Sequence, residues 1–67
     1  MSKTYKKIEI VGTSDVSYAE ATRNGIAKAS ETVRNMDWFE VVEMRGRIAD
    51  GGVQQFQVTL KIGFRLD

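Results

Sequence analysis

The segment from Gln55 to Leu66 alternates apolar and polar side chains almost without interruption. One set is apolar: Phe56, Val58, Leu60, Ile62, Phe64 and Leu66. The other set is polar: Gln55, Gln57, Thr59, Lys61 and Arg65. Successive residues of a β-strand point to opposite faces of the sheet, so this pattern predicts a strand with one buried and one solvent-facing side. The rest of the chain must cover one face of a sheet, and the other face remains open for assembly or for a ligand.

Two earlier segments predict the partner strands. In Lys3–Val11, Ile8 and Ile10 point to one face. The opposite face takes Tyr5, Lys7, Glu9 and Val11. A longer strand is predicted from about Met36 to Ile48. The sequence Asp50-Gly51-Gly52 tolerates the positive φ angles of tight turns, so the longer strand and the alternating strand should form a hairpin.

A helix is predicted between the first two strands. Ser17 and Glu20 have the spacing of a capping box, in which each side chain accepts a hydrogen bond from the other residue's backbone N–H, so the helix should begin there. Its buried stripe, at steps of three and four, is Tyr18, Ala21, Thr22, Gly25, Ile26, Ala29 and Val33. The small members of this stripe let a sheet approach closely, and Asn35 is a suitable left-handed stop residue. The sequence therefore predicts one α+β domain, residues 1–67, with the order β-α-β-β and a three-stranded antiparallel sheet that partly wraps one helix.

Composition narrows the classes of function. A chain of 67 residues buries only about 60% of its unfolded surface and needs reinforcement. It has no cysteine and no histidine, which excludes disulfides and makes a structural zinc site very unlikely. Self-assembly is the remaining common route. The net charge of +1 argues against nucleic acid as a partner, and the absence of a long apolar run argues against a membrane. We therefore expect a soluble cytoplasmic protein.

Catalysis and metal binding are not expected. Without histidine or cysteine, the common proton shuttles and thiolate nucleophiles are missing, and the serines have no imidazole to activate them. Three carboxylates could in principle do acid–base work: Asp37, Glu40 and Glu43. Ion pairs with Arg45 and Arg47 across the sheet are the commoner role. We therefore predict a protein that is not an enzyme and has no catalytic or metal-ligating residue.

The single tryptophan, Trp38, has two possible roles. An indole often packs in a core, where it supplies a large apolar area. However, Trp38 shares a strand face with Glu40, whereas Phe39 and Val41 lie on the other face and are better core candidates. We also expect the aromatic side chains of the last strand to fill the space beneath the helix. An indole on the outer face would instead meet another subunit or stack on a flat ligand.

Other polar residues also have a simple and a more specific interpretation. Gln57 is either an ordinary surface amide or a hydrogen-bonding partner for the carbonyl–imide edge of a pyrimidine-like ring. Arg45 is either a surface cation or a bidentate partner for phosphate. The lysines near the first strand, Lys3, Lys6 and Lys7, are either solvated or placed to meet an anionic ligand.

Three segments together resemble the dodecin family of small flavin-binding proteins: YKKIEIVGTS (5–14), DWFEVVEMRGRI (37–48) and QVTLKIGFRLD (57–67). The resemblance covers essentially the whole chain and implies a hollow homododecamer with the β-α-β-β fold. It also implies that two flavins stack on each other between Trp38 side chains of symmetry-related subunits. Gln57 would then bind the pyrimidine edge of the flavin, Arg45 would approach its ribityl or phosphate region, and Asp37 would border the pocket.

The resemblance implies a second ligand, coenzyme A, at subunit junctions. The residues expected to bind it lie around the first strand and the helix: Lys3, Tyr5, Lys6, Lys28 and Arg65. Two residues depart from the family pattern. Thr22 and Gly25 stand where apolar residues or alanine are more common, which affects the expected stability of the helix more than the stacking motif.

These expectations lead to a protein that stores and sequesters flavin, as FMN, riboflavin or a related isoalloxazine, and quenches its photoreactivity by electron transfer from the indole. The alternative is an oligomeric coenzyme A-binding module whose flavin site is vestigial. Binding of single-stranded nucleic acid would need a basic groove, which the near-neutral charge does not favour. A flavin enzyme is disfavoured because a ring covered on both faces gives a substrate no approach.

Overall fold

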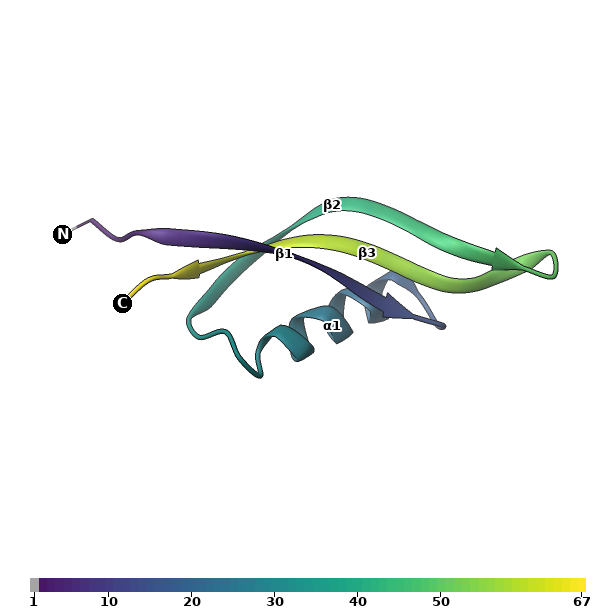
Figure 1. The fold of residues 1–67 in the computed structure, drawn as a ribbon, viewed down its shortest axis with the longest axis horizontal. Helices are drawn as coiled ribbons and strands as arrows, with labels where there is room; N and C mark the ends of the chain where they lie inside the picture. Colours follow the sequence, from purple (N-terminus) through teal and green to yellow (C-terminus); the bar gives the residue numbers. More distant parts are fainter. Residues whose placement is uncertain (1) are drawn as a thin grey trace.

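The predicted element order is confirmed by the structure, a computed structural model that describes residues 2–67. Strand β1 (Tyr5–Ser14) is followed by helix α1 (Tyr18–Ala29), and strands β2 (Met36–Ala49) and β3 (Gly52–Arg65) form the hairpin (Figure 1). The strands make one antiparallel sheet in the order β1-β3-β2. The strongly alternating segment is thus the central strand, which explains its clear two-sided pattern.

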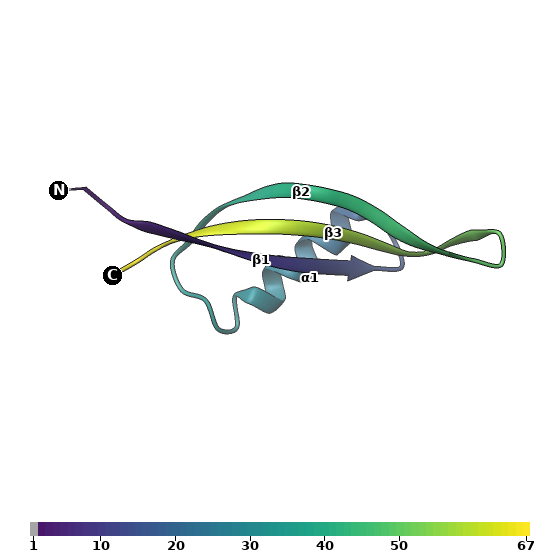
Figure 2. The same cartoon turned by 45° about the horizontal axis from the view of Figure 1, so that its top comes forward.

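Helix α1 crosses one face of the sheet and packs mainly on β1 and β3 (Figure 2). Small residues bring the two layers together: a Cβ added at Gly25 would lie 3.1 Å from the Cα of Gly12, and one added at Gly12 would overlap the backbone carbonyl of Ala21. The close contact predicted for Gly25 is therefore confirmed. The buried apolar residues are Ala21, Ala29, Val58, Leu60 and Ile62.

The aromatic residues of β3 are not the main filling of this core, contrary to the sequence-based expectation. Phe56 is half-buried and meets Tyr18 edge-on, with ring centroids 4.9 Å apart. Phe64 is also half-buried. The helix backbone lies so near the sheet that aliphatic side chains fill the space between them, and the rings are left to its margins.

The start of α1 is predicted correctly, but only half of the capping box forms. The Ser17 hydroxyl accepts a hydrogen bond from the Glu20 backbone N–H at 3.0 Å. In the other direction, the Ser17 N–H donates to the Ser14 hydroxyl at 3.5 Å, and the Glu20 carboxylate pairs with Arg23 at 3.2 Å. Serine at this position satisfies a free N–H of the first turn, so the cap still stabilises the helix.

The helix ends earlier than its apolar stripe predicts. It stops at Ala29, and Val33 lies beyond it in an irregular segment. The Ser30 hydroxyl donates to the carbonyl of Ala27 at 2.6 Å, a local bond that competes with helical continuation. Asn35 does adopt a left-handed conformation, with φ of 62°. It serves the turn into β2 and does not close the helix.

Strand β2 is the least covered part of the sheet. Phe39 lies opposite Ile62 and Val41 opposite Leu60, so both share the helix-side face as predicted. However, each is 49% exposed, and Met44 on the same face is 55% exposed. The expectation that Phe39 and Val41 belong to the core is therefore wrong for the single chain, because α1 sits over the other two strands.

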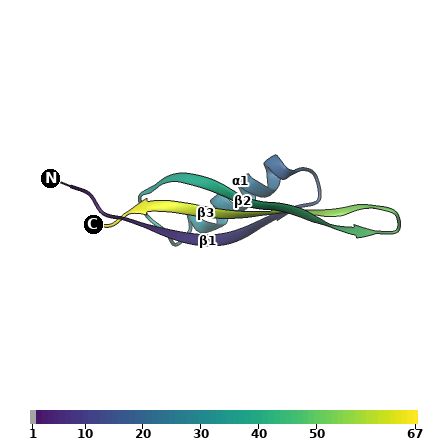
Figure 3. The same ribbon diagram turned by 90° about the horizontal axis from the view of Figure 1, so that it is seen from above.

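The molecule is long and thin (Figure 3), with extents of 54 × 20 × 13 Å. The two termini lie near one end and the β2–β3 turn, where Asp50 and Gly51 have φ of 54° and 79°, lies at the other (Figure 1). Its radius of gyration is 13.9 Å, against about 11 Å for a compact chain of this length. Its accessible surface is 4959 Å², against roughly 4,200 Å² for a compact monomer of this mass.

Candidate ligand-binding face

The indole of Trp38 lies on the sheet face opposite to α1. Trp38 faces Gly63 across the β2–β3 ladder, and its ring covers that residue. A Cβ added at Gly63 would lie 2.5 Å from the ring carbon Cη2, so the ring rests directly on the strand backbone. The ring of Tyr5 meets the indole from β1, with centroids 5.3 Å apart and planes at 60°. The Trp38 side chain is nevertheless 38% exposed, so a planar surface is presented outward.

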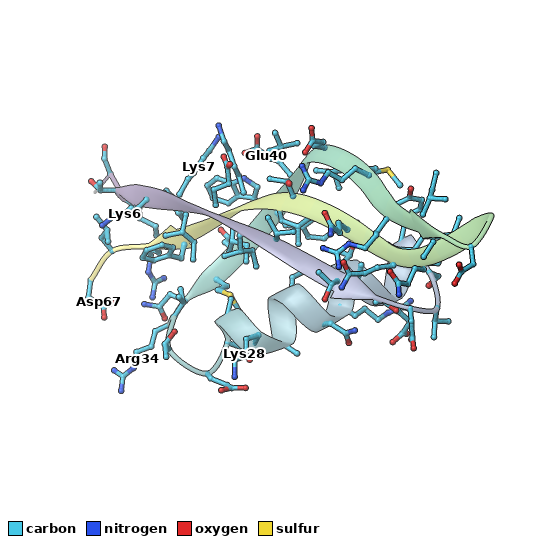
Figure 4. The ribbon with its side chains drawn as sticks, turned by 45° about the vertical axis from the view of Figure 1, so that its right-hand side comes forward. Lys6, Lys7, Lys28, Arg34, Glu40 and Asp67 are labelled. Carbon is cyan, nitrogen blue, oxygen red and sulfur yellow. The ribbon has the colours of Figure 1, made fainter. Side chains whose placement is uncertain are left out.

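A carboxylate holds the polar edge of this indole. The Nε1–H of Trp38 donates to Oε2 of Glu40 at 3.1 Å, and the Lys7 ammonium meets the same oxygen at 2.7 Å. Figure 4 shows Lys7 and Glu40 on the side of the sheet away from α1. The hydrogen bond from Lys7, and then that from Trp38, lowers the pKa of Glu40 below its ordinary value of 4.5. Glu40 therefore stays an acceptor at neutral pH.

A second polar group lies farther along the same face. Arg45 faces Gln57, and its Nε donates to the Gln57 amide oxygen at 2.6 Å. The Gln57 amide nitrogen donates in turn to the amide oxygen of Gln55 at 2.7 Å. Glu43 lies 3.9 Å from the Arg45 guanidinium. The amide of Gln57 is thus oriented, with its oxygen toward the arginine.

Irregularities in β2 decide which residues share this face. The register shifts between Val41 and Glu43, so Val42 is an extra residue in the strand. Strict alternation would place Trp38 and Arg45 on opposite faces, and the shift brings both to the outer face. A second shift between Met36 and Trp38 leaves Asp37 as an extra, exposed residue beside the indole.

One chain does not bring all four predicted flavin residues together. Trp38 faces Gly63 and Arg45 faces Gln57. The six-residue step along β3 separates the two groups by about 20 Å at the usual strand rise. That span is longer than the three fused rings of an isoalloxazine. The ring system of one flavin therefore cannot touch both groups of the same chain.

The residues predicted to bind coenzyme A are also divided. Lys3, Tyr5 and Arg65 line a polar hollow of about 320 Å³ near the termini, together with Asn35, Met36 and Asp37. Lys6 faces Phe64 on the helix side of the sheet. Lys28 lies on α1 and pairs with Glu31 at 3.5 Å.

Sequence reasoning placed Glu40 on the strand face of Trp38 but did not foresee the hydrogen bond between them. It did not assign Gly63 or Lys7 to the surroundings of the indole. The role of Gly63 could have been predicted from the sequence, because a glycine inside an otherwise regular strand often marks the close approach of another group. The Lys7–Glu40 pair joins β1 and β2 across β3, and no spacing in the sequence indicates it. The earlier expectation that Glu40 pairs with an arginine is wrong. Its carboxylate pairs with Lys7, which lies on the opposite edge strand, β1.

Two findings concern other classes of site. Within residues 2–67, no group of three or more acidic side chains is close enough to hold a metal ion. In the same part of the chain, no helix is long and apolar enough to span a bilayer.

The fold and the outer sheet face that carries Trp38 define a class of protein. Its members are small β-α-β-β proteins whose open sheet face carries an aromatic side chain with charged partners. The chain belongs to the dodecin family, whose sequence profile matches residues 4–67. It is 49% identical to a dodecin of Thermus thermophilus over 67 residues, which cover all of this chain and 97% of that protein.

Solved structures agree with this assignment. A dodecin from Streptomyces davaonensis is 54% identical and superposes with a TM-score of 0.97, covering 100% of this chain and 98% of that one. The W38F variant of the T. thermophilus dodecin is 47% identical, with a TM-score of 0.94 and 98% coverage of both chains. The predicted family and fold are thereby confirmed.

Proposed function

We propose that this protein binds flavin for storage and sequestration and catalyses no reaction. Family membership and the presentation of Trp38 support this proposal. The indole lies flat on Gly63, is held at its polar edge by Glu40, and remains partly exposed on a sheet face. A planar, electron-rich ring in that setting suits an electron-poor isoalloxazine, because stacking removes both apolar surfaces from water.

The proposed working form is a homododecamer. The exposed apolar side chains of β2, notably Phe39, Val41 and Met44, need a cover. The chain also exposes more surface than a compact monomer of its mass, which is typical of a subunit. The separation of Trp38 from Gln57 adds a functional reason, because only an assembly can place them on one ligand. A symmetric interface would supply two indoles, one on each side of a stacked flavin pair.

In this assembly, Gln57 hydrogen-bonds the pyrimidine edge of the flavin, Arg45 approaches the ribityl or phosphate region, and Asp37 borders the pocket. The oriented Gln57 amide retains one N–H and one oxygen lone pair for the ligand. Photoexcited flavin takes an electron from the adjacent indole and the electron then returns. The ring thus relaxes without reacting with its surroundings.

A fluorescence titration tests the proposal. Apo-protein is added to riboflavin or to FMN, and flavin emission should fall to a low plateau as the rings stack on Trp38. Trp38→Ala should weaken binding by about 30-fold or more, the loss of a hot-spot contact of roughly 2 kcal/mol. Gln57→Ala should have a smaller effect and change the preference among flavins. Unchanged emission at saturating protein would refute flavin binding.

A second candidate, coenzyme A binding, is favoured by the hollow that Lys3, Tyr5 and Arg65 line together. Two cations beside an aromatic ring suit a phosphorylated adenine nucleotide. Calorimetry with coenzyme A and with FMN separates the two functions. Heat with coenzyme A alone would indicate a binding module whose flavin site is vestigial.

A further inference from the structure

The contacts of Trp38 show how an exposed indole keeps one orientation. Gly63 supports one face of the ring, and the Tyr5 ring meets it edge-on. Neither of these contacts is a hydrogen bond. The hydrogen bond from Nε1 to Glu40, at 3.1 Å, is the directional contact that fixes the polar edge.

Glu40 is itself held from two other strands. Lys7 on β1 bonds the same carboxylate oxygen at 2.7 Å, and Lys61 on β3 contributes a favourable charge. Glu9, another acidic residue on the outer face, lies opposite Lys61 on β1. The indole is therefore anchored through a chain of contacts that crosses the whole sheet from β2 to β1.

We propose that Glu40, anchored by Lys7, is a positioning residue that fixes the tilt of the Trp38 indole for stacking on the ligand. This inference rests on the proposed flavin function and deepens it. A side chain that is already ordered loses less conformational freedom on binding than one that must be immobilised, so preorganisation raises affinity. Loss of the anchor should therefore weaken flavin binding by roughly two- to tenfold for each indole.

The alternative is an ordinary exposed ion pair between Lys7 and Glu40, which contributes little to stability and nothing to the ligand site. The two explanations differ in their effect on the indole. A positioning role requires that the ring change its orientation, and with it the near-ultraviolet circular dichroism, when the carboxylate is removed. A simple surface pair requires no such change.

The experiment compares Glu40→Leu, Glu40→Gln and Lys7→Met with Glu9→Leu as the matched control, since Glu9 lies on the same face. Trp38 is the only tryptophan, so one indole N–H resonance and the near-ultraviolet circular dichroism of apo-protein report its orientation directly. Riboflavin titration of each variant then measures affinity. Thermal unfolding and sedimentation establish that each variant folds and assembles.

Glu40→Leu should shift or broaden the indole resonance and weaken riboflavin binding, while Glu9→Leu leaves both unchanged. Glu40→Gln keeps an acceptor oxygen and should restore most of the affinity. Lys7→Met removes only the anchor and should give an intermediate result, which stands even if Glu40→Leu fails to fold. An unaltered indole signal in Glu40→Leu, or an altered signal with wild-type affinity, would overturn the inference. Should wild-type protein not bind riboflavin, the proposed function fails, and the apo-protein spectra still decide whether Glu40 orients the ring.

Discussion

Replacing Gly63 by alanine tests whether the backbone of β3 is the support for the indole. The new methyl group would lie 2.5 Å from Cη2 of Trp38, with two other ring carbons closer still. Carbon atoms rest about 3.5–4.0 Å apart, so the ring must lift by at least roughly 1 Å or swing away from the sheet. The ring is partly exposed, and it can move outward without disturbing the buried core beneath α1.

Gly63→Ala should therefore weaken flavin binding strongly and lower the free energy of unfolding only slightly. Overpacking in a closed core costs about 1–3 kcal/mol, but here the displaced ring relaxes into solvent and the stability loss should stay near the lower end. A displaced Trp38 indole loses part of its stacking energy with the flavin. Stacking of a base on an aromatic side chain is worth about 1–3 kcal/mol. A loss of about 1–2 kcal/mol corresponds to a flavin dissociation constant raised roughly 5- to 30-fold.

Riboflavin titration and thermal unfolding of Gly63→Ala measure the two effects separately. Gly52→Ala is the control, because a Cβ at Gly52 meets nothing within 4 Å. The indole N–H resonance of Gly63→Ala should move, and that of the control should not. Wild-type flavin affinity together with a displaced indole would refute the claim that the ring must lie flat on β3.

Three further predictions concern packing, capping and charge. Gly12→Ala should lower the free energy of unfolding by about 1–3 kcal/mol in a denaturant titration, because its Cβ overlaps the Ala21 carbonyl, and an unchanged midpoint would contradict this. Ser17→Ala should cost about 1 kcal/mol by loss of the bond to the first helical turn, and chemical denaturation would measure it. The folded-state pKa of Glu40 is lowered, so the carboxylate should persist as pH falls below 4.5. The indole N–H resonance should therefore titrate with a midpoint below 4.5, and a midpoint at or above 4.5 would contradict the bond to Lys7.

The regular parts of the fold could be predicted from the sequence. The alternation around Leu60 identified the central strand and its two faces, and the Ser17 cap located the start of the helix, because both are local patterns. The outer placement of Trp38 followed from the same alternation. These features depend on residues that are neighbours in the chain.

The remaining features depend on contacts between distant segments. The exposure of Phe39 results from where the helix crosses the sheet, and side-chain periodicity does not reveal that position. The extra residue Val42 changes which residues of β2 point to each face of the sheet. Arg45 therefore lies on the same face as Trp38, which strict alternation would not allow. The anchor from Lys7 to Glu40 spans three strands. The early end of the helix reflects a local hydroxyl bond at Ser30 that competes with an otherwise continuous apolar stripe.

The placement of α1 over β1 and β3 has a consequence for how the protein tolerates dilution. With the apolar side of β2 left bare, a lone copy lacks part of the cover that a self-sufficient chain would have. In the proposed assembly, folding and association form a single equilibrium, so the melting temperature should rise with total protein concentration. In a dissociated chain, the exposed apolar side chains of β2 would also be available to contact hydrophobic surfaces of other proteins.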